Sequence, residues 1–369
     1  MAKRLLSYAG LIVILVVCVP VTIRGEPPSV PSLEESLRRL PAIDFCGEPV
    51  PLDDSAIRER MEKEMLLSLW DRDQAVLWLK RSRRYFPLIE KMLAQAGLPD
   101  DLKFVSLAES ALRPHAGSPK GAIGFWQFLP ETGRRYGLTV SDAIDQRRNL
   151  AASTKAAMAY YGDLYERFGS WSLAVTAFNM GEEGLEAEIL AQGVRDFYRL
   201  YLPLETQRYL FRILSAKLIL TQPEQFGFFL EDSEYYQPLQ FASVELTCFE
   251  ETSLAVVAKA AKTDFKRIKD LNPELRGHYL EAGTYTLAIP VEGAAGFQER
   301  FGKLHAEWVS KRKERVYVVQ PGDNLSSIAE QFRVPLPAIL IWNRLDVSRH
   351  IHPGDRLVIY PSEEKSESP

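Results

Sequence analysis

The chain has 369 residues, of which 46% are hydrophobic and 25% charged, and its formal net charge at pH 7 is -4. This composition is typical of globular domains, and the length favours two or three of them. The small negative charge argues against a nucleic-acid-binding protein, which normally carries a basic surface. The five histidines and three cysteines show no spacing typical of a metal site, so we expect neither a metal nor another cofactor.

Residues 1–25 are predicted to be an export signal. Lys3 and Arg4 precede an uninterrupted apolar run over Leu11–Val19, which is the pattern of a secretory signal peptide or of a signal anchor. No good small-x-small cleavage site follows. We therefore favour an uncleaved membrane anchor over a cleaved signal, and place lipidation of Cys18 third. In every case the bulk of the chain is exported.

Residues 26–84 are predicted to start extended and then turn helical. The proline-rich part, 26–53, has room for one short helix at 33–40. From Ser55 to about Leu220, apolar residues recur every three to four positions and no alternating strand pattern is visible, so we expect an α domain. Helices are expected at 57–70, 74–85, 86–95, 101–112, 128–136, 149–168, 170–180, 182–191 and 203–220.

The helix expected at 101–112 carries a carboxylate where an apolar residue would fit. The helical face at i, i+3, i+7 and i+10 holds Leu102, Val105, Glu109 and Leu112. The segment 121–128, GAIGFWQF, follows and combines spaced glycines with aromatic rings. Burial beside aromatic rings raises the pKa of a carboxyl group, so Glu109 suits a general acid in a sugar-sized cleft. The alternative is an exposed glutamate on an imperfect apolar stripe.

Two copies of a small unit follow the helical region, at 242–291 and 315–361. They match at a fixed offset of 71 without a gap, and the paired residues include Leu254 with Leu325, Ala258 with Ala329, Asn272 with Asn343, and Gly283 with Gly354. Each copy is predicted as strand, helix, helix, strand, which indicates a duplicated module. Residues 292–314 are expected to be a charged linker with a helical pattern, and the polar tail 362–369 is expected to be disordered.

Cys46 and Cys248 are the cysteines beyond the export signal. In an oxidising compartment they could form a disulfide that joins the N-terminal segment to the first repeat. The alternative is two buried free thiols, and the spacing in the sequence does not decide between them.

The second repeat resembles the LysM family over its full length. The resemblance rests on 317–329, YVVQPGDNLSSIA, on Asn343, and on 351–357, IHPGDRL. It implies binding to N-acetylglucosamine-containing glycans such as peptidoglycan, with contacts carried onto Gly322, Asp323, Asn324, Leu325 and Asn343. In the first repeat, Glu251 and Thr252 stand where the second has Gly322 and Asp323. The first repeat is therefore either a structural spacer or a second glycan-binding module.

Residues 85–222 resemble the lysozyme-like catalytic domain of lytic murein transglycosylases. Four motifs come in the family's order: AES at 108–110, GAIGFWQFLPETG at 121–133, AFNMG at 177–181, and PLET at 203–206 with Tyr209. The expected architecture is thus mainly α, a lysozyme-like helical domain followed by two small βααβ LysM modules. The resemblance implies a periplasmic, membrane-associated enzyme of the cell envelope that acts on peptidoglycan glycan strands.

The resemblance assigns Glu109 as a single general acid and base. It would cleave the β-1,4 bond between N-acetylmuramic acid and N-acetylglucosamine without water, leaving 1,6-anhydro ends. It also implies substrate contacts from Ser110, Gln127, Phe178, Asn179, Glu205 and Tyr209. Phe178 replaces the family's tyrosine, so the enzyme is either slower or uses another hydroxyl, such as that of Tyr136 or Tyr209. The alternatives are a hydrolytic muramidase of the same fold and a non-catalytic peptidoglycan-binding scaffold.

Overall fold

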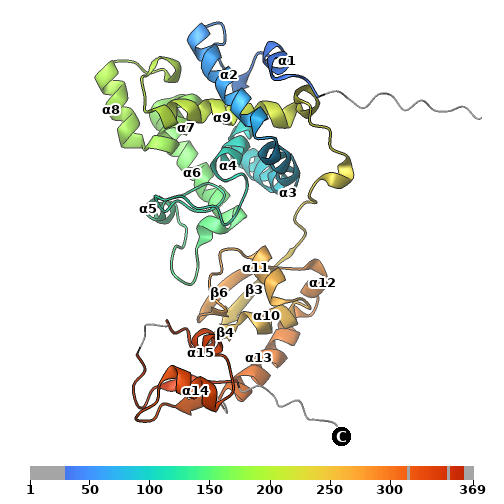
Figure 1. The fold of residues 1–369 in the computed structure, drawn as a ribbon, viewed down its shortest axis with the longest axis vertical. Helices are drawn as coiled ribbons and strands as arrows, with labels where there is room; N and C mark the ends of the chain where they lie inside the picture. Colours follow the sequence, from blue (N-terminus) through green and yellow to red (C-terminus); the bar gives the residue numbers. More distant parts are fainter. Residues whose placement is uncertain (1–29, 314–315, 347–349, 361–369) are drawn as a thin grey trace, which may run out of the picture.

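The computed structural model describes residues 30–313, 316–346 and 350–360. Its upper half in Figure 1 is a helical domain, and its lower half holds the two repeats. This confirms the predicted fold class, mainly α with two small modules that contain strands. The export signal at 1–25 and the tail at 362–369 lie outside the described residues. Within the described residues, no helix is both long enough and apolar enough to cross a membrane.

Helix α9 (Leu204–Thr221) runs through the centre of the helical domain. Ten of its residues are buried, and it contacts helices from several parts of the chain. Around it lie α2 (Ser55–Trp70), α3 (Arg72–Ala96), α4 (Lys103–Ser110) and α7 (Trp171–Met180). The remaining elements are α1 (Leu33–Arg38), β1 (Asp44–Phe45), β2 (Glu48–Pro49), α5 (Pro130–Arg135), α6 (Leu150–Phe168) and α8 (Glu182–Gln192).

The largest differences from the expected helices concern α3 and α4. The helices expected at 74–85 and 86–95 are one helix, α3, which continues through Pro87. Proline costs about 3 kcal/mol inside a helix, but Trp78, Phe86 and Ile89 are all buried along α3, and this packing keeps the helix continuous. The helix expected at 101–112 ends at Ser110, because the next two residues adopt positive φ angles of 51° and 57°.

The disulfide considered for Cys46 and Cys248 is wrong. Both cysteines are free thiols. Cys46 packs against the core of the helical domain, whereas Cys248 belongs to the separate core of the first repeat. The two modules are held together by other contacts, described below.

The first repeat pairs a long strand at its start with a long strand at its end. β3 (Ala242–Cys248) and β6 (Gly283–Ile289) run antiparallel, with Ala242 opposite Ile289 and Cys248 opposite Gly283. Between them lie β4 (Thr252–Ser253), α10 (Leu254–Ala260), α11 (Phe265–Leu271) and β5 (Tyr279–Leu280). The second repeat has the same order in β7 (Val316–Val318), α14 (Leu325–Gln331), α15 (Leu336–Asn343) and β8 (Arg356–Val358).

A shared asparagine fixes the second helix of each repeat to its last strand. The Asn272 amide nitrogen donates to the carbonyl oxygens of Ile268 and Ala288, each at 2.8 Å, and its oxygen accepts from the Ala288 N–H. Asn343 makes the same three bonds within the second repeat. The helix partners Ile268 and Ile339 keep the offset of 71, whereas the strand partners Ala288 and Val358 stand at an offset of 70, so the contact is repeated with a shift of one residue in the last strand.

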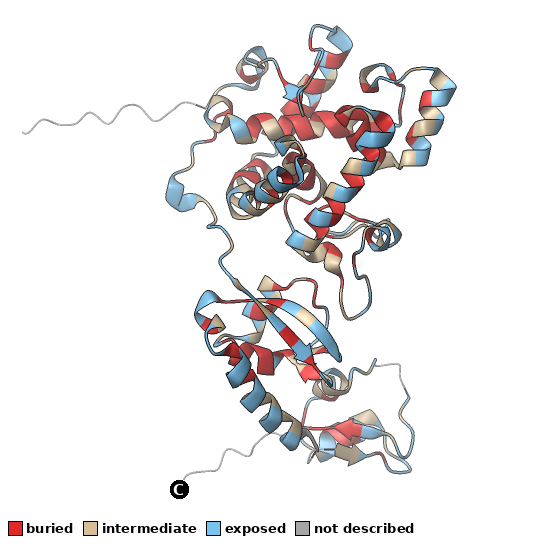
Figure 2. Ribbon diagram, turned by 180° about the vertical axis from the view of Figure 1, so that it is seen from behind, coloured by how far each residue is buried: buried red, intermediate tan, exposed pale blue. Residues whose placement is uncertain are grey.

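The expected linker at 292–314 is mostly helix. After the short α12 (Val291–Ala294), α13 (Phe297–Lys313) packs along α10 of the first repeat. Phe297 and Phe301 are buried in that repeat's core, and His305 stacks on Phe301 with ring centres 5.2 Å apart. The apolar face of α13 makes it part of the first repeat, while its charged face is exposed (Figure 2).

Candidate active site

The carboxyl group of Glu109 lies at the C-terminal end of α4, against the central helix α9. The Tyr209 hydroxyl donates a hydrogen bond to Oε1 of Glu109. Tyr209 itself is only 1% exposed, so its hydroxyl reaches Glu109 from a position inside the core. The carboxyl predicted from the sequence as a general acid is thus held by a hydroxyl from a helix a hundred residues away.

The electrostatics of the site bring the pKa of Glu109 close to neutral pH. Burial raises the pKa of Glu109 from 4.5 to about 7, because the charged form loses its contact with water. The hydrogen bond from Tyr209 and the positive charge of Arg212 lower this pKa, and the negative charge of Glu205 raises it. A pKa near 7 lets one carboxyl group both donate and accept a proton at neutral pH.

One face of α9 supplies all three groups that act on Glu109. Glu205, Tyr209 and Arg212 are spaced at i, i+4 and i+7, which places them on the same side of a helix. Glu205 is exposed in the first turn, and the guanidinium of Arg212 lies over the Tyr209 ring at 5.5 Å. Sequence reasoning missed Arg212, although its spacing from Tyr209 could have indicated it.

Phe178 belongs to an aromatic cluster beside the acid. Its ring stacks on Tyr161, with centres 4.8 Å apart and planes at 19°, and it also contacts Phe128 and Tyr160. The Tyr161 hydroxyl is buried and finds no hydrogen-bond partner of good geometry among the described residues. Burial and the nearby Glu109 hold the pKa of Tyr161 well above its ordinary value.

Of the two tyrosines considered as replacements for a hydroxyl at position 178, only Tyr209 contacts the acid. The Tyr136 hydroxyl donates instead to Oδ2 of Asp163, at 2.9 Å. Tyr209 therefore supplies a donor to Glu109 that does not depend on residue 178.

The glycine-rich segment 121–128 forms a loop that is fixed to α4, the helix that carries Glu109. Ser110, next to Glu109, places its Oγ 2.9 Å from the carbonyl oxygen of Phe125. The Gln127 amide donates to the carbonyl oxygens of Ala116 and Gly124, at 3.1 and 2.9 Å. Ser110 and Gln127 were predicted as sugar contacts, and in the structure these hydrogen bonds shape the wall beside the acid.

The aromatic residues of this loop are core residues. Trp126 is fully buried and donates from Nε1 to Oγ1 of Thr154 at 3.0 Å, and Phe128 is buried against Phe178. Neither ring offers a face for sugar stacking.

Asn179 joins the ends of two helices near the site. It lies at the end of α7, and its Oδ1 accepts a hydrogen bond from the hydroxyl of Thr206 in the first turn of α9, at 3.0 Å. The structure thus gathers Glu109, Phe178 and Tyr209 around one centre. Glu205 is exposed at its edge, and Asn179 braces α7 against α9.

Sequence comparisons assign the chain to a family. The model of the transglycosylase SLT domain matches residues 86–200, and that of the LysM domain matches 317–359. The chain is 31% identical over 332 residues to membrane-bound lytic murein transglycosylase D of Escherichia coli (strain K12), covering 85% of this chain and 72% of that protein. The chain belongs to the family of membrane-bound lytic murein transglycosylase D.

Two further likenesses cover smaller parts of the chain. A putative tributyltin chloride resistance protein of Alteromonas sp. (strain M-1) is 33% identical over 110 residues, which is 29% of this chain and 53% of that protein. Among solved structures, the 70 kDa soluble lytic transglycosylase of Escherichia coli shares 16% identity, with a TM-score of 0.34 over 50% of this chain and 36% of that one.

Four of the five residues assigned to glycan binding in the LysM repeat lie in and beside its first loop, and the fifth, Asn343, ends α15. Oδ2 of Asp323 accepts hydrogen bonds from the Tyr317 hydroxyl and the Gln320 N–H, both at 2.7 Å. Asn324 caps α14, and Leu325 packs against the core of the repeat. Gly322 has a φ of 92°, which favours glycine in this turn. Like Asn343, the polar side chains of Asp323 and Asn324 therefore make hydrogen bonds within the repeat itself.

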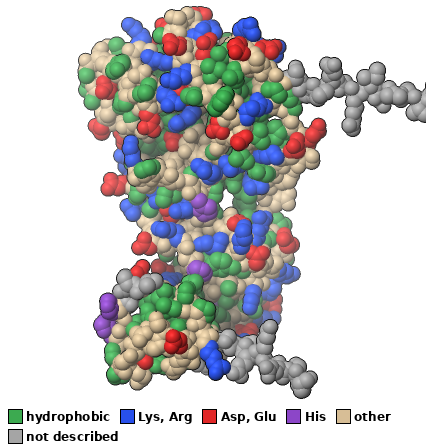
Figure 3. All heavy atoms as spheres, viewed as in Figure 1, with side chains coloured by type: hydrophobic (Ala, Val, Ile, Leu, Met, Phe, Trp, Pro, Cys, Tyr) green, Lys and Arg blue, Asp and Glu red, His purple; other side chains and the backbone are tan. Residues whose placement is uncertain are grey.

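Charges elsewhere on the molecule are mixed. The face in Figure 3 shows acidic and basic side chains interspersed over the helical domain. Within the described residues, no group of three or more His, Cys, Asp or Glu side chains could hold a metal ion.

Proposed function

We propose that the protein is a lytic transglycosylase that cleaves the β-1,4 bond between N-acetylmuramic acid and N-acetylglucosamine in peptidoglycan. The observation that carries the proposal is the half-buried carboxyl of Glu109, whose pKa is about 7 and whose oxygen accepts a hydrogen bond from Tyr209. Membership of the transglycosylase family supports the same reaction.

In the first step Glu109 acts as the acid. Its proton passes to the glycosidic oxygen, the bond from that oxygen to C1 of the muramic sugar breaks, and the electron pair leaves with the oxygen. Negative charge then develops on Glu109, where the Tyr209 hydroxyl and the nearby Arg212 stabilise it. The hydrogen bond therefore strengthens as the proton departs.

In the second step Glu109 acts as the base. The C6 hydroxyl oxygen of the same muramic sugar bonds to C1, and its proton returns to Glu109, which restores the starting enzyme. The product carries a 1,6-anhydro ring, and water is not consumed.

The second repeat is proposed to attach the enzyme to its substrate. Its LysM match covers 317–359, and a bound module raises the local concentration of glycan at the catalytic domain. We infer a division into a catalytic domain at 85–222, a first repeat at 242–291 and a second repeat at 315–361. The name of the Escherichia coli relative supports a place in the cell envelope, held at the membrane by the segment at 1–25.

A hydrolytic reaction is the second candidate, and Glu205 is the observation that favours it. A hydrolase that inverts or retains configuration uses a second carboxylate near the acid. Among the described residues, Glu205 is the carboxylate whose charge acts on Glu109, and it stands exposed at the edge of the site.

Product analysis on purified sacculi tests these assignments. We expect wild type to release fragments with 1,6-anhydromuramic ends and Glu109→Gln to release almost none, while Glu205→Gln keeps the anhydro product. Reducing ends from wild type would establish the hydrolase. Equal release by wild type and Glu109→Gln would remove Glu109 from the mechanism, and no release by wild type would favour a non-catalytic scaffold.

A further inference from the structure

The first repeat is docked onto a loop of the catalytic domain, between α5 and α6. Ile144 in this loop forms a β-bridge with Leu275 of the repeat. On either side, the Asp145 N–H donates to the Glu274 carbonyl and the Arg276 N–H donates to the Ala143 carbonyl, each at 2.9 Å. In Figure 1 this loop reaches down from the helical domain to the repeat.

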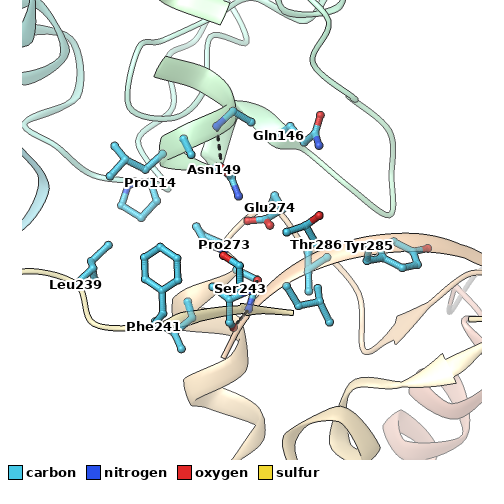
Figure 4. A pocket seen from close by; sticks show the side chains of 18 of the residues that line it. Pro114, Gln146, Asn149, Leu239, Phe241, Ser243, Pro273, Glu274, Tyr285 and Thr286 are labelled. Atoms are coloured by element: carbon cyan, nitrogen blue, oxygen red, sulfur yellow. Dashed lines mark hydrogen bonds between the residues drawn. The ribbon is translucent and has the colours of Figure 1, made fainter. Parts of the chain in front are cut away.

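The docking also includes an apolar contact. The side chain of Ile144 packs against the core of the first repeat. Beside it a cavity of about 520 Å³ separates the two domains. In Figure 4, Pro114 and Gln146 lie on its upper side, and Phe241 and Thr286 on its lower side. Beside this cavity the two domains are joined by the backbone bonds, by the Ile144 contact and by an ion pair between Arg276 and Asp142 at 4.0 Å.

The docked segment also holds the glycine-rich loop. Asp145 and Arg147 form a buried ion pair through two hydrogen bonds of 2.8 Å, with side chains 1% and 5% exposed. The same guanidinium donates to the carbonyl oxygens of Gly121 and Phe128, at 2.9 and 3.0 Å. Arg147 thereby ties both ends of the loop at 121–128 to the segment that the repeat holds.

Close packing completes the connection to the acid. Gly124 lies so near the backbone of Arg147 that a Cβ on it would stand 1.8 Å from the Arg147 carbonyl oxygen. The next residue, Phe125, accepts the hydrogen bond from Ser110 beside Glu109. A continuous series of contacts therefore runs from the first repeat to the catalytic helix.

The loop that departs from the LysM pattern in the first repeat contacts the second repeat. Glu251, which aligns with Gly322, forms an ion pair with Arg344 of the second repeat, with Nε of Arg344 3.2 Å from Oε2 of Glu251. Glu281 pairs with the same guanidinium at 3.3 Å, and the guanidinium lies 5.3 Å from the centre of the Tyr279 ring. Of the two altered residues in this repeat, Glu251 serves a contact between modules.

We propose that the first repeat is a positioning element of the catalytic site, acting through Ile144, Asp145 and Arg147 on the glycine-rich loop beside Glu109. The proposal rests on the proposed function, since it concerns the rate of that reaction. It makes Asp145 and Arg147 positioning residues, and it makes the first repeat part of the catalytic unit.

The test compares Ile144→Ser with Ile341→Ser in the full-length protein. Ile341 is 43% exposed in the second repeat and serves as the matched control. Turnover is measured on sacculi and on a short glycan oligomer, and binding to sacculi is measured separately. We expect Ile144→Ser to lower kcat at least about tenfold on both substrates with little change in KM, and Ile144→Val and Ile341→Ser to behave as wild type.

Hydrogen exchange provides the readout that separates positioning from general instability. We expect faster exchange at the amides of 121–128 in Ile144→Ser, with unchanged exchange in α6. Unchanged kcat on the short oligomer, or loss confined to sacculus binding, would overturn the proposal and make the repeat a binding module. Equal acceleration of exchange throughout the helical domain would also overturn it. An inactive wild type would instead sink the proposed function and this inference together.

Discussion

The two repeats share a fold and differ in what surrounds them. Asn272 and Asn343 make the same kind of hydrogen bonds, so both copies keep a link between the second helix and the last strand. The first copy is covered by α13, docked on the loop around Ile144 and paired with Arg344. The second copy keeps the LysM sequence pattern in its first loop. The first copy is thus docked on the helical domain, and the second copy is the one proposed to bind substrate.

This comparison predicts that turnover and attachment respond to different substitutions. The largest effect is expected for Glu109→Gln, which should lower kcat by about 10³-fold because it removes the transferable proton. Sacculus binding by this variant should equal that of wild type, since the second repeat is untouched. Co-sedimentation with sacculi checks this, and a parallel loss of binding would contradict the division.

The same substitution should also change stability with pH. Burial raises the pKa of Glu109 to about 7 in the folded state. As pH rises above about 4.5, the carboxyl ionises first in the unfolded chain, which lowers the free energy of unfolding of wild type. Below about pH 4.5 the carboxyl is protonated in both states and has no such effect. Relative to wild type, Glu109→Gln should gain stability as pH rises from about 4.5 to 7, by up to about 3 kcal/mol. Urea unfolding at pH 4, 6 and 8 measures this, and a constant difference across pH would refute the raised pKa. The gain should be confined to the catalytic domain.

Tyr209→Phe should change turnover by the catalytic domain and leave attachment to sacculi as it is. Loss of a hydrogen bond to a charged group is worth about 1.5–3 kcal/mol, which corresponds to a roughly 10- to 100-fold lower kcat. Because the hydroxyl lowers the pKa of Glu109, its removal should raise that pKa and move the alkaline limb of the pH–rate profile to higher pH. Phe178→Leu serves as a control that should leave the limb in place.

The smallest effect is expected from a matched pair in the repeats. Asp323→Ala removes the acceptor that shapes the first loop of the second repeat, and should weaken sacculus binding about tenfold. Thr252→Ala, at the aligned position of the first repeat, should leave binding unchanged. Weaker binding in both variants would show that the first repeat also attaches glycan.

Patterns in the sequence predicted much of the architecture. Contacts between residues far apart in the sequence were not predicted. The periodicity around Glu109 and the fixed offset of the repeats can both be read from the sequence. The first agrees with the fold up to Ser110, where α4 ends, and the second agrees with the shared order of strands and helices. The continuity of α3 through Pro87 depends on burial against other helices, which the sequence does not show. Likewise the choice of Tyr209 over Tyr136 as the donor to Glu109, and the docking of Ile144, depend on how helices meet in space.

The aromatic face of α13 has a consequence for how attachment operates. A helix of 17 residues spans about 25 Å, and its stacked rings at Phe297, Phe301 and His305 clamp it along the first repeat. Up to Lys313, the segment that leads to the second repeat is therefore a stiff arm fixed to the first repeat. A stiff arm raises effective concentration only near the distance it spans. A glycan strand bound by the second repeat would then reach Glu109 at a fixed distance along the strand from the bound sugars.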